Sequence, residues 1–203
     1  MANGYLQAGQ DIGSQSETNV TIGQNVNGST PSGGGRLKVS NILIGPTALA
    51  SIGTNTTDVA GQFWLADILI PYNRVITKIG FLQGGTATTD KTLVAIWDSY
   101  GKLVASSAIA GVLLSGANTF QEQAIALDGA GNAATSVQLY GPQRYFIGVQ
   151  GNGTTAGSLR TVATATFIDI LGSTLAGTFG TVPATITPPT TFTADNAPVV
   201  YVL

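Results

Sequence analysis

Carboxyl groups are the side chains most able to carry acid–base chemistry here, because the 203 residues include no histidine and no cysteine. Two carboxyl groups at a suitable separation can hydrolyse a glycosidic bond. The candidates in the part of the sequence expected to be β-structure are Asp58, Asp67, Asp90, Asp98, Glu122 and Asp128. The sequence pairs none of them, and most lie in or beside turns, where aspartate bonds nearby backbone amides. We therefore predict no catalytic residue and no enzyme.

Two of these carboxylates suggest structural roles. Asp67 interrupts an apolar run and is expected either to face outward or to form an ion pair with Arg74 or Lys78. Asp128 begins the segment Asp-Gly-Ala-Gly-Asn, which lacks the alternating carboxylates and closing glutamate of a calcium loop and is interpreted as a turn. Zinc sites are also excluded, since they use cysteine or histidine. We predict no metal site and no cofactor.

The low charge restricts the class of partner. Eight basic and ten acidic residues give a net charge of −2, and only 9% of residues are charged. This composition provides no positive electrostatic potential that would attract a phosphate backbone, so we expect no nucleic-acid partner. Met1 to Gln10 shows no secretory signal, and Leu103 to Gln121 is interrupted by polar residues, which indicates two strands and a turn. We expect no membrane partner.

A surface of neutral hydroxyl and amide groups is easily desolvated, because burying such groups costs far less than burying ions. This favours a protein that is partly covered by other subunits, including copies of itself. The alternative is a polar β-protein with few ion pairs.

The first 36 residues are rich in Gly, Asn, Gln, Ser and Thr, and their apolar residues are too sparse to form a core. We interpret residues 1–36 as an extended arm ending in a glycine hinge. The first basic residue is Arg36, so an arm that binds anything should bind protein. The alternative is a tail without a role. The candidate partner-binding residues are Tyr5, Leu6, Ile12, Val20 and Ile22.

From residue 37 to 203, short apolar runs alternate with Gly, Pro, Asn and Thr, which is typical of an all-β domain. The fold class expected is a jelly-roll-like antiparallel β-sandwich with an extended N-terminal arm. The expected strands are 37–44, 48–52, 62–70, 75–83, 92–98, 102–108, 119–127, 137–140, 144–150, 161–171 and 198–203.

Turn-forming residues separate several of the expected strands. Asp98 and Gly101 predict a tight hairpin between residues 96 and 104. Residues 71–74 and 151–155 predict two further turns. The Pro- and Thr-rich segment 181–198 should be extended, and the uncharged strand that follows should pair within the sandwich, a neighbouring molecule being the alternative.

Most aromatic residues fall inside the expected strands and should fill the core. Tyr72 and Tyr100 lie at turns and are candidates for contact with a partner or a glycan. A glycan-binding groove could also expose Trp97.

The segments 94–108, 118–121 and 141–149 together resemble β-sandwich domains of virion proteins from tailed bacteriophages. Such domains occur in capsid decoration (cement) proteins and in head or tail fibres, and the resemblance covers roughly residues 62–150. It implies a jelly-roll-like sandwich on the outer surface of the virion, often trimeric, made in the host cytoplasm. It transfers no functional residue, since none of the matching segments marks a site.

The sequence therefore favours a decoration protein that stabilises a phage head by binding across subunits of the major capsid protein or another virion protein. The alternatives are a fibre domain that binds a host receptor or glycan, and a minor jelly-roll capsid protein that builds the shell itself.

Overall fold

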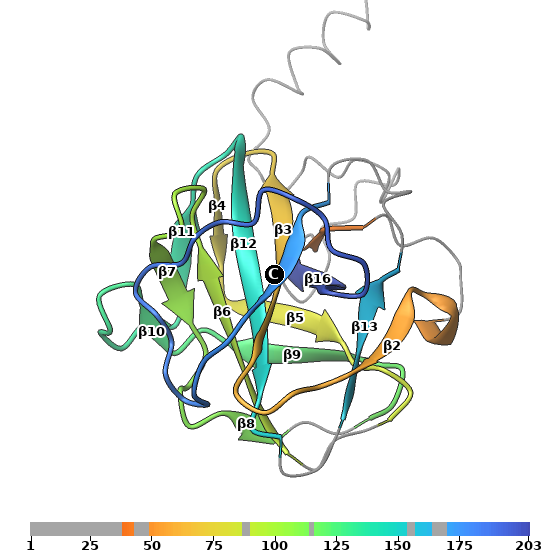
Figure 1. The fold of residues 1–203 in the computed structure, drawn as a ribbon. Helices are drawn as coiled ribbons and strands as arrows, with labels where there is room; N and C mark the ends of the chain where they lie inside the picture. The colour runs from red at the N-terminus through yellow and green to blue at the C-terminus, as the bar shows by residue number, and fades with distance from the viewer. Residues whose placement is uncertain (1–37, 43–48, 87–89, 114–115, 154–156, 164–169) are drawn as a thin grey trace, which may run out of the picture. The chain divides into compact units, whose positions relative to one another are not determined.

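The computed structural model describes residues 38–42, 49–86, 90–113, 116–153, 157–163 and 170–203. These residues form the all-β antiparallel sandwich expected from the sequence (Figure 1). The arm and its candidate partner-binding residues Tyr5, Leu6, Ile12, Val20 and Ile22 lie outside the described residues, so their role stays a prediction.

Two sheets form the main layers, and neighbouring strands are often far apart in the chain, as in a jelly roll. The larger sheet has the order β10-β7-β6-β12-β3-β14, with β8 also paired to β6. Its strands are β3 (Phe63–Ile70), β6 (Lys91–Trp97), β7 (Leu103–Ser106), β8 (Val112–Leu113), β10 (Leu127–Asp128), β12 (Gln143–Gly151) and β14 (Gly172–Leu175).

The second layer has the order β1-β16-β5-β9. Its strands are β1 (Val39–Ser40), β5 (Lys78–Leu82), β9 (Phe120–Ala124) and β16 (Val200–Val202). Smaller ladders complete the fold, and they join β2 (Thr54–Thr57), β13 (Ser158–Val162) and β15 (Ala197–Pro198) in one sheet and β4 (Arg74–Ile76) and β11 (Val137–Leu139) in another.

Both faces of the larger sheet are buried. On β3, Trp64 and Ile68 face the main core between the two layers, whereas Phe63 and Leu65 face a second core that also contains Trp97. Two-sided burial explains why β3 is a nearly continuous apolar run rather than a strict alternation of apolar and polar residues.

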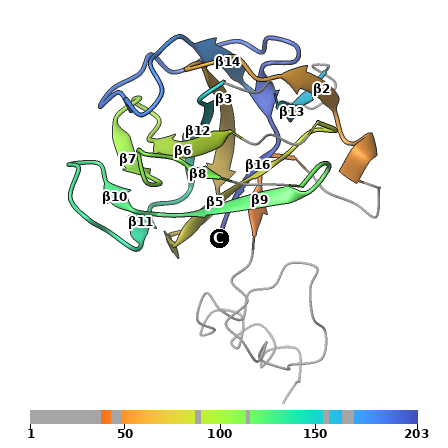
Figure 2. The same ribbon diagram turned by 90° about the horizontal axis from the view of Figure 1, so that it is seen from below.

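The second core is closed by residues 176–190, which we call the strap. The strap crosses the outer face of the larger sheet, opposite β5 and β9 (Figures 1 and 2). It pairs with the β6–β7 hairpin, because the Leu103 N–H donates to Ala184 O at 2.9 Å and the Ile186 N–H donates to Gly101 O at 2.8 Å. The first part of the Pro- and Thr-rich segment is thus extended along the hairpin and covers a hydrophobic surface, whereas a turn at residues 194–196, with Asp195 at a φ of 62°, interrupts the part that follows.

The hairpin between β6 and β7 forms as predicted. The backbone N–H of Gly101 donates to Asp98 O at 2.9 Å. Gly101 has a φ of 81°, and a Cβ atom there would collide with Ile186 O of the strap. Glycine is therefore needed both for the turn and for the close approach of the strap.

The C-terminal strand pairs within the sandwich, as predicted, since β16 lies between β1 and β5. The Tyr201 ring crosses Gly80 of β5, where any Cβ atom would overlap it. Its hydroxyl donates to Glu122 Oε1 at 2.5 Å, and Lys78 Nζ donates to Glu122 Oε2 at 3.0 Å. This network fixes β16, β5 and β9 together on the outside of the second layer.

Two strand predictions are wrong in detail. The expected strand 48–52 contains a 3₁₀ helix at Leu49–Ser51, with Ile52 N donating to Leu49 O at 3.2 Å. The chain turns directly afterwards at Gly53, whose φ is 61°, so this short apolar run cannot extend into a ladder. Of the expected strand 161–171, only the first two residues belong to a strand, β13, among the residues described; positions 163, 170 and 171 lie in none, and residues 164–169 are outside the described part of the chain.

Candidate functional site

Several of the candidate carboxylates stabilise the fold. An ion pair was expected at Asp67, and one forms with Arg144 at 3.0 Å, a residue that the sequence did not single out, whereas Lys78 pairs with Glu122. Its other oxygen accepts the backbone N–H of Leu171 at 2.7 Å. Because Asp67 is 6% exposed and fully engaged in linking β3 to the start of β14, it has a structural role.

Asp58 is held at the start of the turn that leads into β3. Trp64 Nε1 donates to its Oδ1 at 3.1 Å. Burial raises the pKa of the Asp58 carboxyl to about 6, and the nearby charge of Asp90 adds to this effect, while hydrogen bonds from Trp64 and the Val59 backbone oppose it. Asp58 and Asp90 thus interact electrostatically, a proximity that the sequence did not reveal.

The raised pKa makes stability depend on pH. Between about pH 4 and pH 6 the folded protein holds a proton on Asp58 that the unfolded chain has released, so raising the pH favours unfolding. We expect the free energy of unfolding to fall by about 2 kcal/mol between about pH 4 and pH 6, allowing for partial exposure of the carboxyl group. Above about pH 6, Asp58 should cause no further change in stability. Urea denaturation at half-unit pH intervals measures this change.

Asp58→Asn is the matched control, because its side-chain oxygen can still accept the Trp64 hydrogen bond but cannot titrate. The difference in unfolding free energy between the two proteins at each pH isolates the contribution of Asp58 from that of the other titrating groups. Parallel pH profiles of the two proteins would contradict the prediction.

Three turns gather at one end of the sandwich, and we call them the turn cluster: residues 71–73, 98–101 and 140–142 (Figure 1). The Gly141 N–H donates to Asn73 Oδ1 at 2.9 Å. Gln143 Nε2 donates to Ser99 Oγ, also at 2.9 Å. Side chains from three separate parts of the sequence are therefore fixed next to one another.

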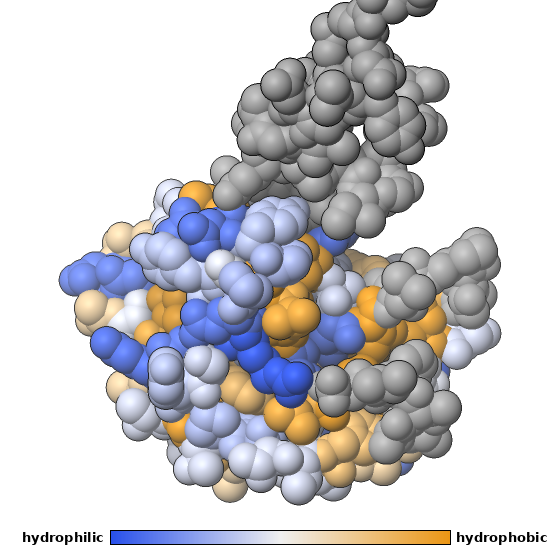
Figure 3. Space-filling model, turned by 90° about the horizontal axis from the view of Figure 1, so that it is seen from above, coloured by the Kyte–Doolittle hydropathy of each residue, from blue (hydrophilic) through white to orange (hydrophobic). Residues whose placement is uncertain are grey.

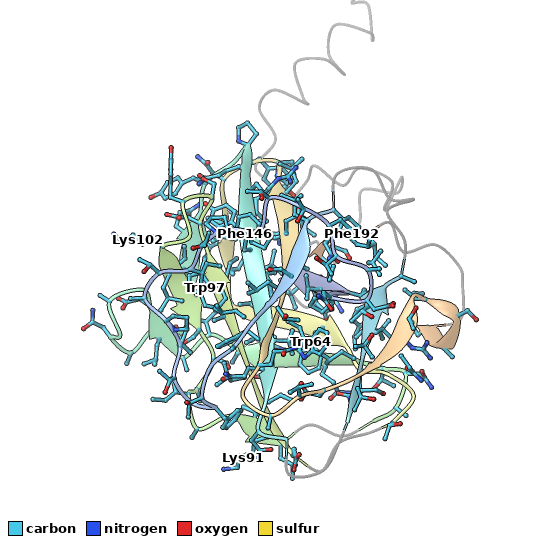
Figure 4. All side chains as sticks on the ribbon, in the orientation of Figure 1. Trp64, Lys91, Trp97, Lys102, Phe146 and Phe192 are labelled. Carbon is cyan, nitrogen blue, oxygen red and sulfur yellow. The ribbon has the colours of Figure 1, made fainter. Side chains whose placement is uncertain are left out.

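A surface depression of about 420 Å³ with both polar and apolar lining opens beside the turn cluster. Leu103, Val104 and Tyr145 contribute half-buried or buried side chains to its wall. The more polar or exposed residues around it are Asp98, Lys102, Asp128, Gln138, Tyr140 and Gln143. Lys102 lies at the edge of the molecule in Figure 4, outside the buried Trp97. We call this feature the Asp98–Asp128 depression.

Both aspartates of the depression are fixed by backbone amides. Asp98 Oδ1 accepts hydrogen bonds from the N–H groups of Tyr100 and Lys102, each at 2.9 Å. Asp128 Oδ1 accepts the N–H groups of Ala130 and Asn132 at 2.9 Å. The Asn132 bonds are the main cause of a lowered pKa at Asp128, the opposite of what a general acid needs. Both segments predicted as turns are turns, and their carboxylates are rigidly oriented.

The structure separates the aromatic candidates. Tyr100 is 86% exposed, as expected of a contact residue, and Tyr72 is half-buried. Trp97 is fully buried against Phe63 and the strap, so the suggestion that it lines an exposed groove is wrong (Figure 4). The sequence could not show this, because the strap that covers Trp97 is more than eighty residues away in the chain.

Tyr140 is a candidate that sequence reasoning missed. Its side chain is 62% exposed and lines the depression. The hydroxyl of the buried Tyr145 accepts the Tyr140 N–H at 2.8 Å and donates to Tyr140 O at 3.1 Å. The sequence offered one signal for it. Tyr140 directly precedes Gly141 and Pro142, which predict a turn, and the strand β11 ends at Leu139 just before it.

The first described residues of the sandwich form a second feature of interest, the root of the N-terminal segment. Val39 and Ser40 pair with Val202 and Tyr201 in the β1–β16 ladder. Asn41 adds a reciprocal clamp, because its Nδ2 donates to Pro198 O at 2.9 Å and its Oδ1 accepts the Val200 N–H at 2.9 Å. We call residues 39–41 the root.

Exposed apolar side chains occur in several places rather than as one continuous face. Ile109, Val112 and Leu113 lie close together in sequence around the bend from β7 to β8, and Leu113 is 60% exposed. On the face shown in Figure 3, apolar residues form separate groups among pale, weakly polar residues and a band of strongly hydrophilic ones. Such a surface can be covered by another protein with little loss of charge hydration.

Within the described ranges, no three Asp, Glu, His or Cys side chains gather where they could hold a metal ion. The same part of the chain contains no helix with the length and apolar character of a membrane span. The segment 103–121 contains β7, β8 and the start of β9, in line with its interpretation as strands and turns.

Comparisons of the chain with protein-family models, with curated proteins and with solved structures find no match. The resemblance to virion sandwich domains thus depends on the strand and hairpin pattern of residues 62–150.

Proposed function

We propose that this protein is a non-catalytic structural component of a bacteriophage virion, a decoration protein that binds across coat subunits of the head through its N-terminal arm. The observation that carries the proposal is the root. It fastens the chain directly after the arm to β16, a strand whose three residues are buried in the sandwich.

This attachment suits a protein that must hold on to a shell. A force applied through residues 1–36 reaches Val39 and Ser40, where ladder bonds and both polar atoms of the Asn41 side chain resist it together. A single exposed contact would break alone, whereas these bonds must break as a group. The root therefore couples the arm to the stability of the whole sandwich.

The surface supports the same role. Charged residues are only 9% of the chain, so a neighbouring subunit would have to desolvate few ions to cover it. The exposed group Ile109, Val112 and Leu113 offers apolar area at such a contact. Binding to the assembled lattice in preference to free coat subunits would stabilise the shell by mass action.

Co-sedimentation with undecorated heads tests the proposal. We expect the full chain to bind at a saturating ratio and to raise the temperature at which the heads open, and deletion of residues 2–30 to weaken binding at least tenfold, about 1.4 kcal/mol or more. A location on the outer surface of heads in a reconstruction of intact virions would support the same conclusion.

A matched pair of variants separates specific docking from the mere presence of an arm. One variant replaces the four apolar residues Leu6, Ile12, Val20 and Ile22 with serine, and the other replaces Gln7, Gln10, Gln15 and Gln24 with serine. Only the first should lose binding, because only it removes apolar area that docking would bury. Equal binding by the deletion variant, or equal loss in both serine variants, contradicts the proposal.

A further inference from the structure

The Asp98–Asp128 depression has the form of a ligand site, and none of its lining residues belongs to the root. Its volume of about 420 Å³ lies within the range of about 300–1,000 Å³ that is usual for small-molecule sites. It is too large for a single ion and is lined by acceptors, donors and an aromatic ring. We propose that it binds a short, neutral oligosaccharide.

The carboxylates supply preorganised acceptors. Backbone amides from the turns around residues 98–102 and 128–132 already hold Oδ1 of each aspartate. The carboxylates therefore lose little freedom on binding, which is the main cost of ordering polar side chains around a ligand. Oδ2 of Asp98 has no hydrogen-bond partner among the described residues and can accept sugar hydroxyls.

Lys102 supplies a donor to the same depression. It is exposed and follows Asp98 around the hairpin turn, and it provides an ammonium group for hydroxyl oxygens. Gln143 also lines the depression, and because its Nε2 already donates to Ser99 Oγ, its oxygen adds a further acceptor. Alternating donors and acceptors of this kind match the hydroxyl groups of a pyranose ring, each of which can both donate and accept.

Tyr140 supplies the apolar contact that sugar recognition also needs. Its ring is 62% exposed, while its backbone is clamped on both polar atoms by the Tyr145 hydroxyl. An exposed aromatic ring on a fixed backbone at the edge of the depression can stack on the C–H face of a pyranose, and no backbone freedom is lost when it does so.

The charge of the depression selects among sugars. Asp98 and Asp128 contribute two negative charges and Lys102 one positive charge, so the site carries a net charge of −1. A sialic acid, a uronate or a phosphate would be repelled there. Neutral oligosaccharides of hexoses and N-acetylhexosamines are the class that fits both the charge and the hydrogen-bonding groups.

The test uses the full chain on an array of neutral oligosaccharides of glucose, galactose, mannose and N-acetylglucosamine. Each is printed beside a matched version that carries a sialic acid or a glucuronate. We expect at least one neutral compound to bind, its acidic version to bind at least tenfold more weakly, and chelation of divalent cations to change neither result. Calorimetry with the soluble neutral compound then gives the affinity.

Variants assign the binding to the depression. Tyr140→Ala should weaken it about tenfold, whereas Tyr100→Ala, which removes a more exposed tyrosine that does not line the depression, should leave it unchanged. Asp98→Asn keeps an acceptor for the turn amides but removes a negative charge. It should therefore reduce the difference in affinity between the neutral oligosaccharides and their acidic versions. Unchanged unfolding midpoints show that each variant is folded.

Four results would overturn the proposal: no neutral oligosaccharide bound at millimolar concentration, full binding by Tyr140→Ala, equal loss in Tyr100→Ala, or equal binding of the acidic compounds. None of these depends on whether the protein decorates a head, because the measurements use no virion component.

Discussion

Replacing Trp97 with alanine is expected to lower the free energy of unfolding by about 3–5 kcal/mol. Trp97 is fully buried in the core beneath the strap, where its ring meets Phe63 edge to face at a centroid distance of 5.5 Å. Its Nε1 also donates to Pro183 O at 2.9 Å. The substitution would leave a cavity and break the contact that holds the strap to the sheet.

Urea denaturation followed by circular dichroism measures this loss. Trp97→Phe separates the two contributions, since it retains most of the ring but removes the hydrogen bond to Pro183. Tyr100→Ala on the same hairpin is the surface control and should change stability by no more than about 0.5 kcal/mol. Limited proteolysis should cut the strap in Trp97→Ala before the rest of the sandwich. A loss below about 1 kcal/mol would show that the strap does not depend on this side chain.

The second large effect is expected at Asp67, where alanine should cost about 3 kcal/mol. Asp67 is buried and accepts bonds from both Arg144 and the Leu171 backbone N–H. Removing the carboxylate leaves that N–H without its acceptor and Arg144 without its counter-charge. The arginine side chain is 35% exposed, so water can compensate part of the loss at Arg144 but not at Leu171.

A double-mutant cycle distinguishes the two parts. Asp67→Asn retains an acceptor for Leu171 and should cost about 1–2 kcal/mol. Combining it with Arg144→Gln should cost less than the sum of the two single changes, because both remove the same ion pair. Strict additivity in urea denaturation would mean that the ion pair contributes nothing, and the effect of Asp67→Ala would then come from Leu171 alone.

Local chemistry made much of the fold predictable. The β6–β7 hairpin follows from Asp98 and Gly101, which determine the turn within four residues of one another and need no distant partner. Strand positions in the sandwich follow from short apolar runs bounded by turn residues, and most of the expected strands are present. The same local logic predicted that the proline-rich segment would be extended, because proline cannot donate to a ladder.

Features that join distant segments were not predictable in the same way. The ion pair between Asp67 and Arg144 was not predicted, since it depends on the β3–β12 register, which places Arg144 beside Leu69 on β3. The error at Trp97 has the same origin, because a strand pattern cannot show which distant segment covers its second face.

The chain by itself determined an all-β class, a neutral composition and the places of its turns, because these depend on residue type and on neighbours a few positions away. Tertiary structure alone decided which turns meet, that the strap closes a second core, and that Asp98, Asp128 and Tyr140 surround one depression. Those outcomes depend on strand register and on the packing of segments far apart in sequence, where many pairings satisfy the same local pattern and only the complete core selects among them.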